Sequence, residues 1–242
     1  DSNRLLSAAS DRKSDFVARA SHELRTPLTS IKGSMEYVTA RLARLSPQEA
    51  GNCPQEELRD FFQLITKNTD RLIRMVNTML DIERIEMGMT SAMHYAGLDL
   101  AVVIRETVVG LACLAEEKEV WITSLLPENL PLLADEDRIR QVLTNLLANA
   151  IKFTPDQSTV TIRAFLEEGF AVVEVQDQGA GIPTAMREKV FDKFYKLGNK
   201  EGSGLGLTIC RSIIAAHGGV IGVADSRESG ACLYFWLPAR GE

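Results

Sequence analysis

The sequence has no long apolar stretch and few cysteines. No apolar run approaches the ~20 residues that a membrane-spanning helix needs, although hydrophobic residues make up 45% of the 242-residue chain. The four cysteines are far apart and form no C-x-x-C pair or Cys/His cluster, which argues against a disulfide framework or a zinc site. We therefore expect free thiols in a reducing cytosol and a soluble globular protein.

An excess of positive charge and the common nucleotide-binding signatures are also lacking. The net charge of −6 argues against a nucleic-acid surface, because binding the phosphate backbone needs clustered lysines and arginines. The sequence has no G-x-x-x-x-G-K-[ST] and no G-x-G-x-x-G directly after a strand-like segment, so neither familiar phosphate loop is predicted. The chain begins at Asp1 without a visible signal peptide, and we expect it to be part of a longer or processed protein.

The first ninety residues have the periodicity of two long amphipathic helices. The first apolar stripe consists of Leu24, Leu28, Ile31, Met35, Val38, Leu42 and Leu45. After the segment SPQEAGNCPQEE, which is rich in helix breakers, the second stripe consists of Leu58, Phe61, Phe62, Ile65, Leu72, Met75, Val76, Met79 and Ile82. A lone hairpin cannot bury both stripes, whereas two copies can form a four-helix bundle. The pattern therefore predicts a homodimer.

The segment ASHELRTPLTS (20–30) places a histidine beside a carboxylate, with a proline inside an otherwise helical pattern. At 100° per residue, His22 and Thr26 face away from the apolar stripe, one turn apart. Glu23 can accept the proton from one imidazole nitrogen and leave the other as a nucleophile. Pro27 is expected to bend or loosen the helix. Because an exposed histidine is usually an ordinary surface residue, the rest of the chain has to supply something for it to attack.

From about residue 98 the pattern changes to alternating helices and short strands. Helical patterns cover residues 99–117, 136–153 and 204–217. Strand-like segments, rich in β-branched and aromatic residues, are VWITSLL, TVTIRAF, FAVVEVQ, GVIGVA and CLYFWL. We therefore expect a helical hairpin over 1–90, a linker over 91–97 within MGMTSAMHYAG, and an α/β domain over 98–242 with its own core.

The segment RIRQVLTNLLANAIKFT carries amides on the polar face of a predicted helix. Asn145 and Asn149 lie one turn apart, and Lys152 follows. Asparagine is a poor helix former, whereas amide oxygens suit Mg²⁺ and a lysine suits a phosphate. The alternative is a polar helix face that is simply solvated.

Two glycine-containing segments extend this pattern. In VEVQDQGAGIP a strand ends at Asp177, whose carboxylate can accept a hydrogen bond from an amine such as that of adenine. Gly179 and Gly181 would let a planar ring approach the backbone, although a tight turn after a strand needs glycines anyway. In EGSGLGLTICRSIIAAHGG three glycines precede a helix, where exposed N–H groups form an anion site; a flexible loop is the alternative. These three glycines are Gly202, Gly204 and Gly206.

Taken in order, these motifs resemble the catalytic core of a sensor histidine kinase of two-component signalling. SHELRTPL resembles the H box, NLLANAIKFT the N box, DQGAGIP the G1 box, FDKFYK the F box and GSGLGL the G2 box. The resemblance covers roughly residues 12–240. It implies a two-helix hairpin that forms a dimeric four-helix bundle, followed by an α/β sandwich of the Bergerat type, which gyrase-like and Hsp90-like ATPases share. It also implies that the protein uses ATP and Mg²⁺.

The resemblance implies a role for each matching residue. His22 would be the nucleophile that accepts the phosphoryl group, Glu23 its base, and Thr26 the residue that places a water for dephosphorylating a partner. Asn149 would bind Mg²⁺, with Asn145 close to the metal and the phosphates. The other implied nucleotide contacts are Lys152 with the phosphates, Asp177 with the adenine amine, Gly179 and Gly181 in the adenine pocket, and Gly202, Gly204 and Gly206 in a mobile lid.

The implied activity is autophosphorylation of His22 by ATP and transfer of the phosphoryl group to an aspartate of a response regulator, with phosphatase activity toward that regulator. The implied partners are the regulator and a second copy, without nucleic acid, and with a membrane only through a sensor region outside this chain. The implied location is cytoplasmic.

Two other functions compete with the kinase. A dimeric scaffold that binds ATP but transfers nothing would not need the intact pair of His22 and Glu23. A gyrase-like ATPase would need a glutamate base one turn before Asn149, where this sequence has Asn145. The remaining histidines, His94 and His217, are interpreted as structural.

Overall fold

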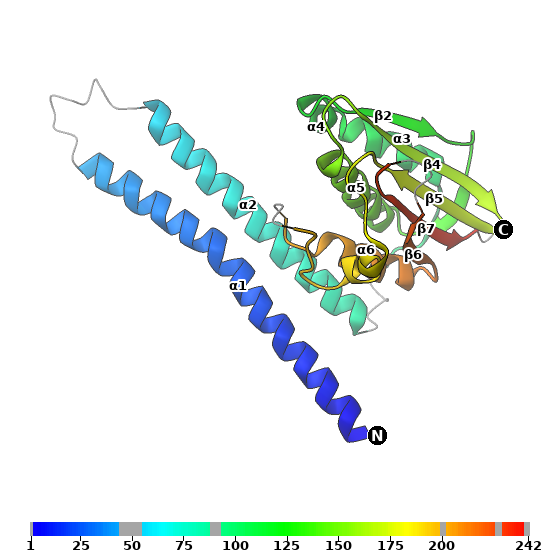
Figure 1. Ribbon diagram of the computed structural model, residues 1–242, viewed down its shortest axis with the longest axis horizontal. Helices are drawn as coiled ribbons and strands as arrows, with labels where there is room; N and C mark the ends of the chain where they lie inside the picture. The colour runs from blue at the N-terminus through cyan, green and yellow to red at the C-terminus, as the bar shows by residue number, and fades with distance from the viewer. Residues whose placement is uncertain (1, 44–54, 88–92, 199–201, 226–228, 240–242) are drawn as a thin grey trace. The chain divides into compact units, whose positions relative to one another are not determined.

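Two long helices, α1 (Ser2–Ala43) and α2 (Gln55–Glu86), form the first part of the chain. The structure, a computed structural model, describes residues 2–43, 55–87, 93–198, 202–225 and 229–239. The chain divides into two units, Asp1–Met79 and Leu80–Glu242. In the first unit the helices lie side by side and run antiparallel (Figure 1), as the two stripes predict. Residues 44–54, which hold most of the breaker-rich connection, and residues 88–92, which include the start of the expected linker, lie outside the described residues.

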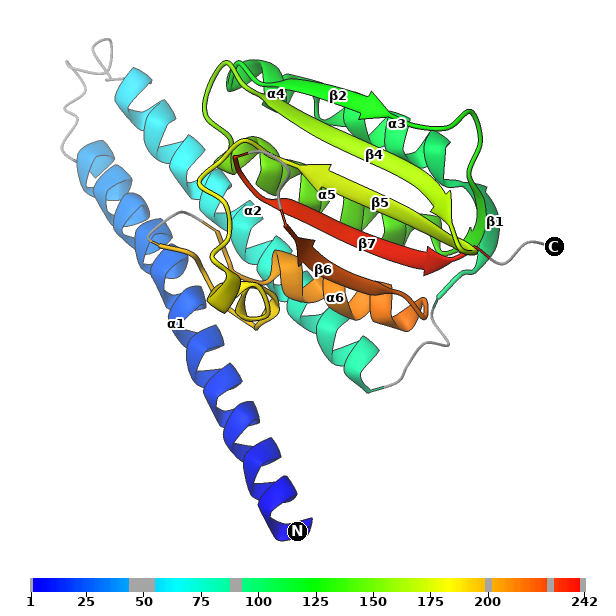
Figure 2. The same ribbon diagram turned by 45° about the vertical axis from the view of Figure 1, so that its right-hand side comes forward.

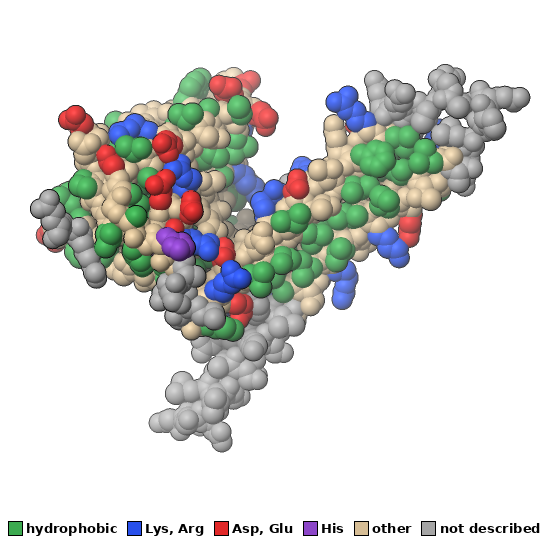
Figure 3. All heavy atoms as spheres, turned by 180° about the vertical axis from the view of Figure 1, so that it is seen from behind, with side chains coloured by type: hydrophobic (Ala, Val, Ile, Leu, Met, Phe, Trp, Pro, Cys, Tyr) green, Lys and Arg blue, Asp and Glu red, His purple; other side chains and the backbone are tan. Residues whose placement is uncertain are grey.

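The buried line along α1 lies next to the predicted stripe rather than on its centre. Ala20, Pro27, Ser34 and Val38 are buried. By contrast, Leu28, Met35 and Leu42 are 53%, 46% and 47% exposed. Apolar side chains gather along the hairpin surface in Figure 3. One chain thus leaves much of the apolar stripe uncovered, and surfaces of this kind usually mark an interaction site.

α1 continues through Pro27 as a single helix from Ser2 to Ala43.

The two helices α1 and α2 make specific contacts with each other: the Tyr37 and Phe61 rings stack with centroids 4.4 Å apart, and the Asn68 side-chain amide donates to Ser30 Oγ at 3.3 Å. These contacts hold the hairpin together at the end of the histidine segment and in the turns that follow it.

The second unit is built on a five-stranded sheet with the strand order β2-β4-β5-β7-β6. Its strands are β2 (Trp121–Leu125), β4 (Thr159–Glu167), β5 (Phe170–Gln176), β6 (Val220–Ala224) and β7 (Cys232–Pro238). β2 runs parallel to β4, and the other neighbours are antiparallel. Each strand coincides with one of the five predicted segments, because alternation of buried and solvated positions is a strong signal.

Helices cover one face of this sheet, as Figure 2 shows. They are α3 (Leu100–Gly110), α4 (Ala112–Glu117), α5 (Glu136–Phe153) and α6 (Gly206–Ala216). Buried positions alternate along β4 and β5, so the core lies between the helices and one face of the sheet. The single helix predicted over 99–117 is wrong in one respect: it divides at Leu111, directly after Gly110, a poor helix former.

A second, two-stranded sheet was not predicted. It pairs β1 (Ala96–Asp99) with β3 (Pro131–Ala134) in antiparallel fashion. Each strand has only four residues, and Gly97 and Pro131 weaken the strand signal. The two strands lead directly into helices. Asp99 Oδ1 accepts the Ala101 N–H at 2.9 Å at the start of α3. At the start of α5, Asp135 accepts the Arg138 N–H at 3.2 Å.

None of the helices in the described part of the chain combines the length and the apolar character of a membrane span.

Candidate active site

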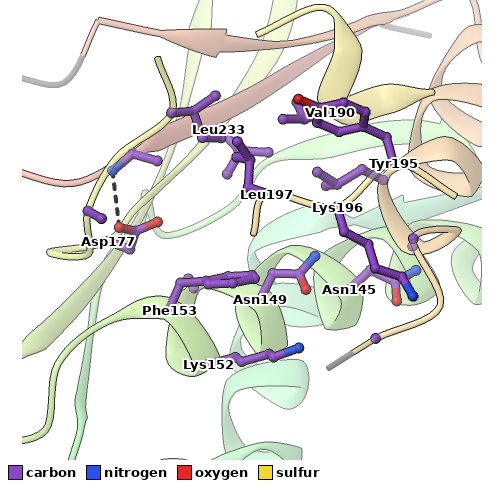
Figure 4. Close-up of a pocket in the computed structure, with 18 of the residues that line it drawn as sticks. Asn145, Asn149, Lys152, Phe153, Asp177, Val190, Tyr195, Lys196, Leu197 and Leu233 are labelled. Atoms are coloured by element: carbon purple, nitrogen blue, oxygen red, sulfur yellow. Dashed lines mark hydrogen bonds between the residues drawn. The ribbon is translucent and has the colours of Figure 1, made fainter. Parts of the chain in front are cut away.

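A pocket of about 370 Å³ opens in the second unit, within the usual range for small-ligand sites. Its walls come from α5, the loop after β5, the segment that contains Tyr195 to Leu197, and the start of α6 (Figure 4). Eight of the nine predicted nucleotide residues line it. They are Asn145, Asn149, Lys152, Asp177, Gly181, Gly202, Gly204 and Gly206. Three motifs that are far apart in the sequence therefore meet at one site.

One wall of the pocket is the polar face of α5. Figure 4 shows Asn145, Asn149 and Lys152 along this helix, with Phe153 at its end. Gly206, the first residue of α6, lies close to both amides: a Cβ there would be 3.6 Å from Asn145 Oδ1 and 4.0 Å from Asn149 Nδ2. The N-terminus of α6 thus faces the amides, and helix N-termini favour anions.

The α6 N-terminus is also suited to a ligand because its N-cap residue is a leucine. Leu205 makes no side-chain capping hydrogen bond, whereas most helices use Ser, Thr, Asp or Asn there. The first-turn N–H groups of a helix have no intrahelical partner. A phosphate group in the pocket can satisfy them.

Asp177 is held rigidly at the opposite side of the pocket. Its residue is only 4% exposed, and its Oδ1 accepts backbone N–H groups from Gly179 at 2.7 Å and Ala231 at 3.0 Å. Figure 4 marks one such contact with a dashed line. Two backbone donors fix the orientation of the carboxylate, so it can present an acceptor to a ligand amine without reorganising.

The predicted glycines have different functions in the structure. Gly179 is not among the residues that line the pocket; a Cβ there would lie 2.6 Å from the Phe153 carbonyl oxygen, so it allows close packing of the loop on α5. Gly204 has φ +69°, and its Cβ would lie 2.6 Å from the Phe194 carbonyl carbon. Glycine is therefore required at 204 both by its backbone conformation and by close approach.

Sequence reasoning missed several pocket residues. Phe153, Tyr195 and Leu197 contribute apolar lining. Phe153 lies beside Lys152 in the predicted helix, so its position on the helix wheel could have placed it near the pocket. Phe191 and Phe194 are buried, at 2% and 8% exposed, in accordance with ordinary core packing.

The predicted phosphoacceptor residues belong to the first unit, on α1. His22 and Thr26 are both exposed, as the helical phase predicts. Thr26 Oγ1 donates to the His22 carbonyl oxygen at 3.4 Å. The Glu23 carboxylate lies 3.9 Å from the Arg71 guanidinium of α2. The imidazole is therefore on an accessible helix surface, with a carboxylate next to it in sequence.

His217 has a structural role at the end of α6, as the sequence predicts. The Asp135 N–H donates to its Nε2 at 3.1 Å, so Nδ1 carries the proton and donates to the Ile213 carbonyl at 2.8 Å. Asp135 Oδ2 also accepts a hydrogen bond from the backbone N–H of His94 at 2.9 Å. Burial lowers the pKa of His217, against the opposing effects of the Ile213 carbonyl and Asp135. A neutral imidazole thus joins the end of α6 to the start of α5.

This arrangement predicts that stability declines in mild acid. The folded state holds His217 neutral, whereas the unfolded state binds a proton near pH 6.5, so the unfolding free energy falls as pH decreases below about 6.5. Protonation also removes the Nε2 contact, whose net contribution is on the order of 1 kcal/mol. Urea unfolding between pH 7.5 and 5.5 should show a steeper decline for the native protein than for His217→Gln. Parallel pH profiles would contradict this assignment.

Comparisons with known proteins point to one family. Residues 134–241 match the family described as histidine kinase-, DNA gyrase B-, and HSP90-like ATPase, and residues 12–88 match the His Kinase A (phospho-acceptor) domain. The chain is 33% identical over 233 residues to the sensor histidine kinase TmoS of Ectopseudomonas mendocina, covering 93% of this chain but 23% of that protein. It thus spans between 23% and 37% of the length of three such relatives.

Solved structures give the same result. The catalytic domain of histidine kinase ThkA is 34% identical and has a TM-score of 0.57, over 61% of this chain and 97% of that one. ThkA in complex with the response regulator protein TrrA is 28% identical with a TM-score of 0.69, over 95% of this chain and 64% of that one. Both units of the chain therefore have counterparts in solved structures.

Proposed function

The chain belongs to the sensor histidine kinases of two-component signalling, and we propose that it transfers the γ-phosphoryl group of ATP to His22 and from there to an aspartate of a response regulator. The observation that supports this most directly is the pocket, where amides and a lysine of α5, the buried Asp177 and the N-terminus of α6 come together. An exposed histidine with an adjacent carboxylate supplies the acceptor.

The pocket residues suit the two ends of ATP differently. Asp177 would accept the adenine amine, while Lys152 and the start of α6 would bind the phosphates. Among the described residues no three His, Cys, Asp or Glu side chains come together as a metal site. Mg²⁺ usually keeps several waters and binds largely through substrate phosphates, so the Asn149 amide, near Asn145, would complete its ligands. When bound, the ion supplies positive charge beside the phosphates.

The transfer step needs only groups that the proposal names. An imidazole nitrogen of His22 attacks the γ-phosphorus in line with the β–γ bridging oxygen through a loose transition state. The N–P bond forms, the P–O bond breaks and ADP leaves. The proton on the other ring nitrogen moves toward Glu23, which offsets the developing positive charge. A hinge in the expected linker over 91–97 would let the histidine and the nucleotide meet.

We also propose a homodimer and a phosphatase activity. The exposed residues Leu28, Met35 and Leu42 would be covered in a four-helix bundle of two hairpins. Thr26, exposed on the same face as His22, would place a water against the phosphorylated regulator. ThkA forms a complex with the response regulator TrrA, which supports a regulator as the partner. The reaction would take place in the cytoplasm, with any membrane attachment through a sensor region of the whole protein.

Labelling from ATP tests this proposal against its alternatives. Incubation with Mg²⁺ and γ-labelled ATP should label the protein, whereas α-labelled ATP should not. The label should be acid-labile and base-stable, as a phosphoramidate is, and should pass to a receiver domain. Bound ATP without label would favour a scaffold, and release of inorganic phosphate without a labelled protein would favour a gyrase-like ATPase.

A further inference from the structure

A lysine outside the pocket binds the end of the helix that lines it. Lys118 directly follows α4, and its ammonium group donates to three backbone carbonyl oxygens. The acceptors are Ile151 at 2.6 Å, Lys152 at 2.5 Å and Thr154 at 2.6 Å. An ammonium group has three N–H donors, and here each of them is directed at the same helix end.

The end of α5 needs such a partner because it lacks a glycine cap. The last carbonyl groups of a helix have no intrahelical N–H partner, and many helices satisfy them with a left-handed glycine. α5 is followed instead by Thr154 in an extended conformation, with φ −68° and ψ 142°. Lys118, 33 residues before Ile151 in the sequence, supplies the donors, and its positive charge is favourable at a helix C-terminus.

This helix end forms part of the pocket wall. The Lys152 and Phe153 side chains line the pocket, and the carbonyl groups on either side of Phe153 are the ones that Lys118 binds. The Phe153 carbonyl oxygen itself would be 2.6 Å from a Cβ on Gly179. The last turn of α5 therefore packs directly on the loop that follows β5.

A hydrogen bond connects the same helix end to Gln178, the residue after Asp177. Thr154 is 1% exposed, and its Oγ1 accepts the Gln178 N–H at 2.9 Å. Gln178 directly follows Asp177, whose Oδ1 accepts the Gly179 N–H at 2.7 Å. A displacement of Thr154 would thus be transmitted through one residue to the carboxylate in the pocket.

We propose that Lys118 is a positioning residue for the nucleotide, an inference that rests on the proposed ATP-binding function. Lys118 is not among the residues that line the pocket, so it acts through the end of α5. Without the ammonium group three carbonyls lose their donor, and the last turn opens more often, because helix ends fray and local opening needs little free energy. Lys152, Phe153 and the Asp177 loop then leave the geometry that binds ATP.

Lys118→Met tests this, because methionine keeps an unbranched apolar side chain and removes the donors. In the full chain we expect ADP to bind roughly tenfold more weakly and the KM for ATP to rise by a similar factor, since small displacements of positioned groups weaken binding strongly. The kcat at saturating ATP should change less. Arg105→Met removes a cation from an exposed position of α3 in the same unit and should leave both quantities unchanged.

Amide hydrogen exchange separates local positioning from global stability. In Lys118→Met, exchange should accelerate in peptides that cover 151–154 and 177–179, while the middle of α5 stays protected. Lys118→Arg, which keeps the charge and donors in a different geometry, should give an intermediate ADP affinity and keeps the test available if the methionine variant does not fold. ADP affinity equal to the native protein, or acceleration spread evenly over the unit, would overturn the proposal.

ADP binding needs no phosphoryl transfer, so the outcomes remain distinguishable. If the native protein is never labelled by ATP but Lys118→Met still weakens ADP binding, the kinase proposal fails and the positioning role stands. If the native protein is labelled and Lys118→Met binds ADP normally, the kinase proposal stands and the positioning role fails.

Discussion

Replacing His22 by glutamine should reduce labelling by γ-labelled ATP to background while leaving ADP affinity unchanged. Glutamine has similar polarity, but the lone pair of its amide nitrogen is delocalised into the carbonyl group, so glutamine lacks the nucleophilic nitrogen of a neutral imidazole. His22 is exposed on α1, so the substitution leaves no cavity and removes no buried contact. The measurement is covalent label per chain at saturating ATP, together with ADP affinity by calorimetry.

Thr26→Ala provides the matched variant on the same helix face. Thr26 is exposed, and its Oγ1 contact with the His22 carbonyl is long, at 3.4 Å. Removing the hydroxyl should therefore leave the helix intact and preserve labelling. Because Thr26 is the residue proposed to place the water, the substitution should abolish dephosphorylation of a phosphorylated receiver domain. If the His22→Gln protein still takes up label, the phosphoryl acceptor is a residue other than His22. A Thr26→Ala variant with unchanged phosphatase activity would show that this threonine does not position the water.

Replacing Asp177 by asparagine should weaken ATP binding by roughly 10- to 150-fold, the equivalent of one charge-assisted hydrogen bond of about 1.5–3 kcal/mol. The asparagine oxygen can still accept the two N–H groups that now bind Asp177 Oδ1, so the loop should keep its conformation. The second oxygen becomes an NH₂ group, which cannot accept a hydrogen bond from the adenine amine. ATP affinity of the two proteins measures the effect.

An ATP analogue without the 6-amino group shows whether this contact is the cause. The native protein should bind the analogue much more weakly than ATP, whereas Asp177→Asn should bind the two about equally. Asp192→Asn, which neutralises an exposed carboxylate 3.6 Å from Arg211, should bind ATP normally. If Asp177→Asn still prefers ATP to the analogue by the native ratio, Asp177 does not bind the amine.

The elements predicted well are those with a strong repeating pattern. The α5 helix agrees with its predicted range of 136–153, because its apolar positions recur with helical period and Asp135 caps its start. The sheet strands agree for the corresponding reason, alternation with period two. The pair β1–β3 was missed because four-residue strands with a glycine or a proline have no such pattern. Gly110 carried a local signal for the break between α3 and α4 that the long helical pattern obscured.

The site residues were likewise predicted in part. Residue type and spacing identified the amides of α5, the acidic residue at a strand end and the glycines before α6, because few kinds of side chain can bind a metal, an amine or a phosphate. Local sequence did not reveal that Gly179 serves packing on the Phe153 carbonyl rather than the pocket surface. It also gave no indication of which side of the apolar stripe on α1 would be buried within one hairpin.

The sequence by itself determined the long helices and the five strands of the larger sheet, the exposure of His22 and eight of the residues that line the pocket. These depend on periodicity and on side-chain chemistry within a few residues. Only the tertiary structure decided how the pocket is held. The ammonium group of Lys118 reaches the end of α5, and His217 joins α6 to Asp135. Both contacts join segments far apart in the chain, and hydrogen bonds of this kind depend on the distance between folded segments, which no local pattern encodes.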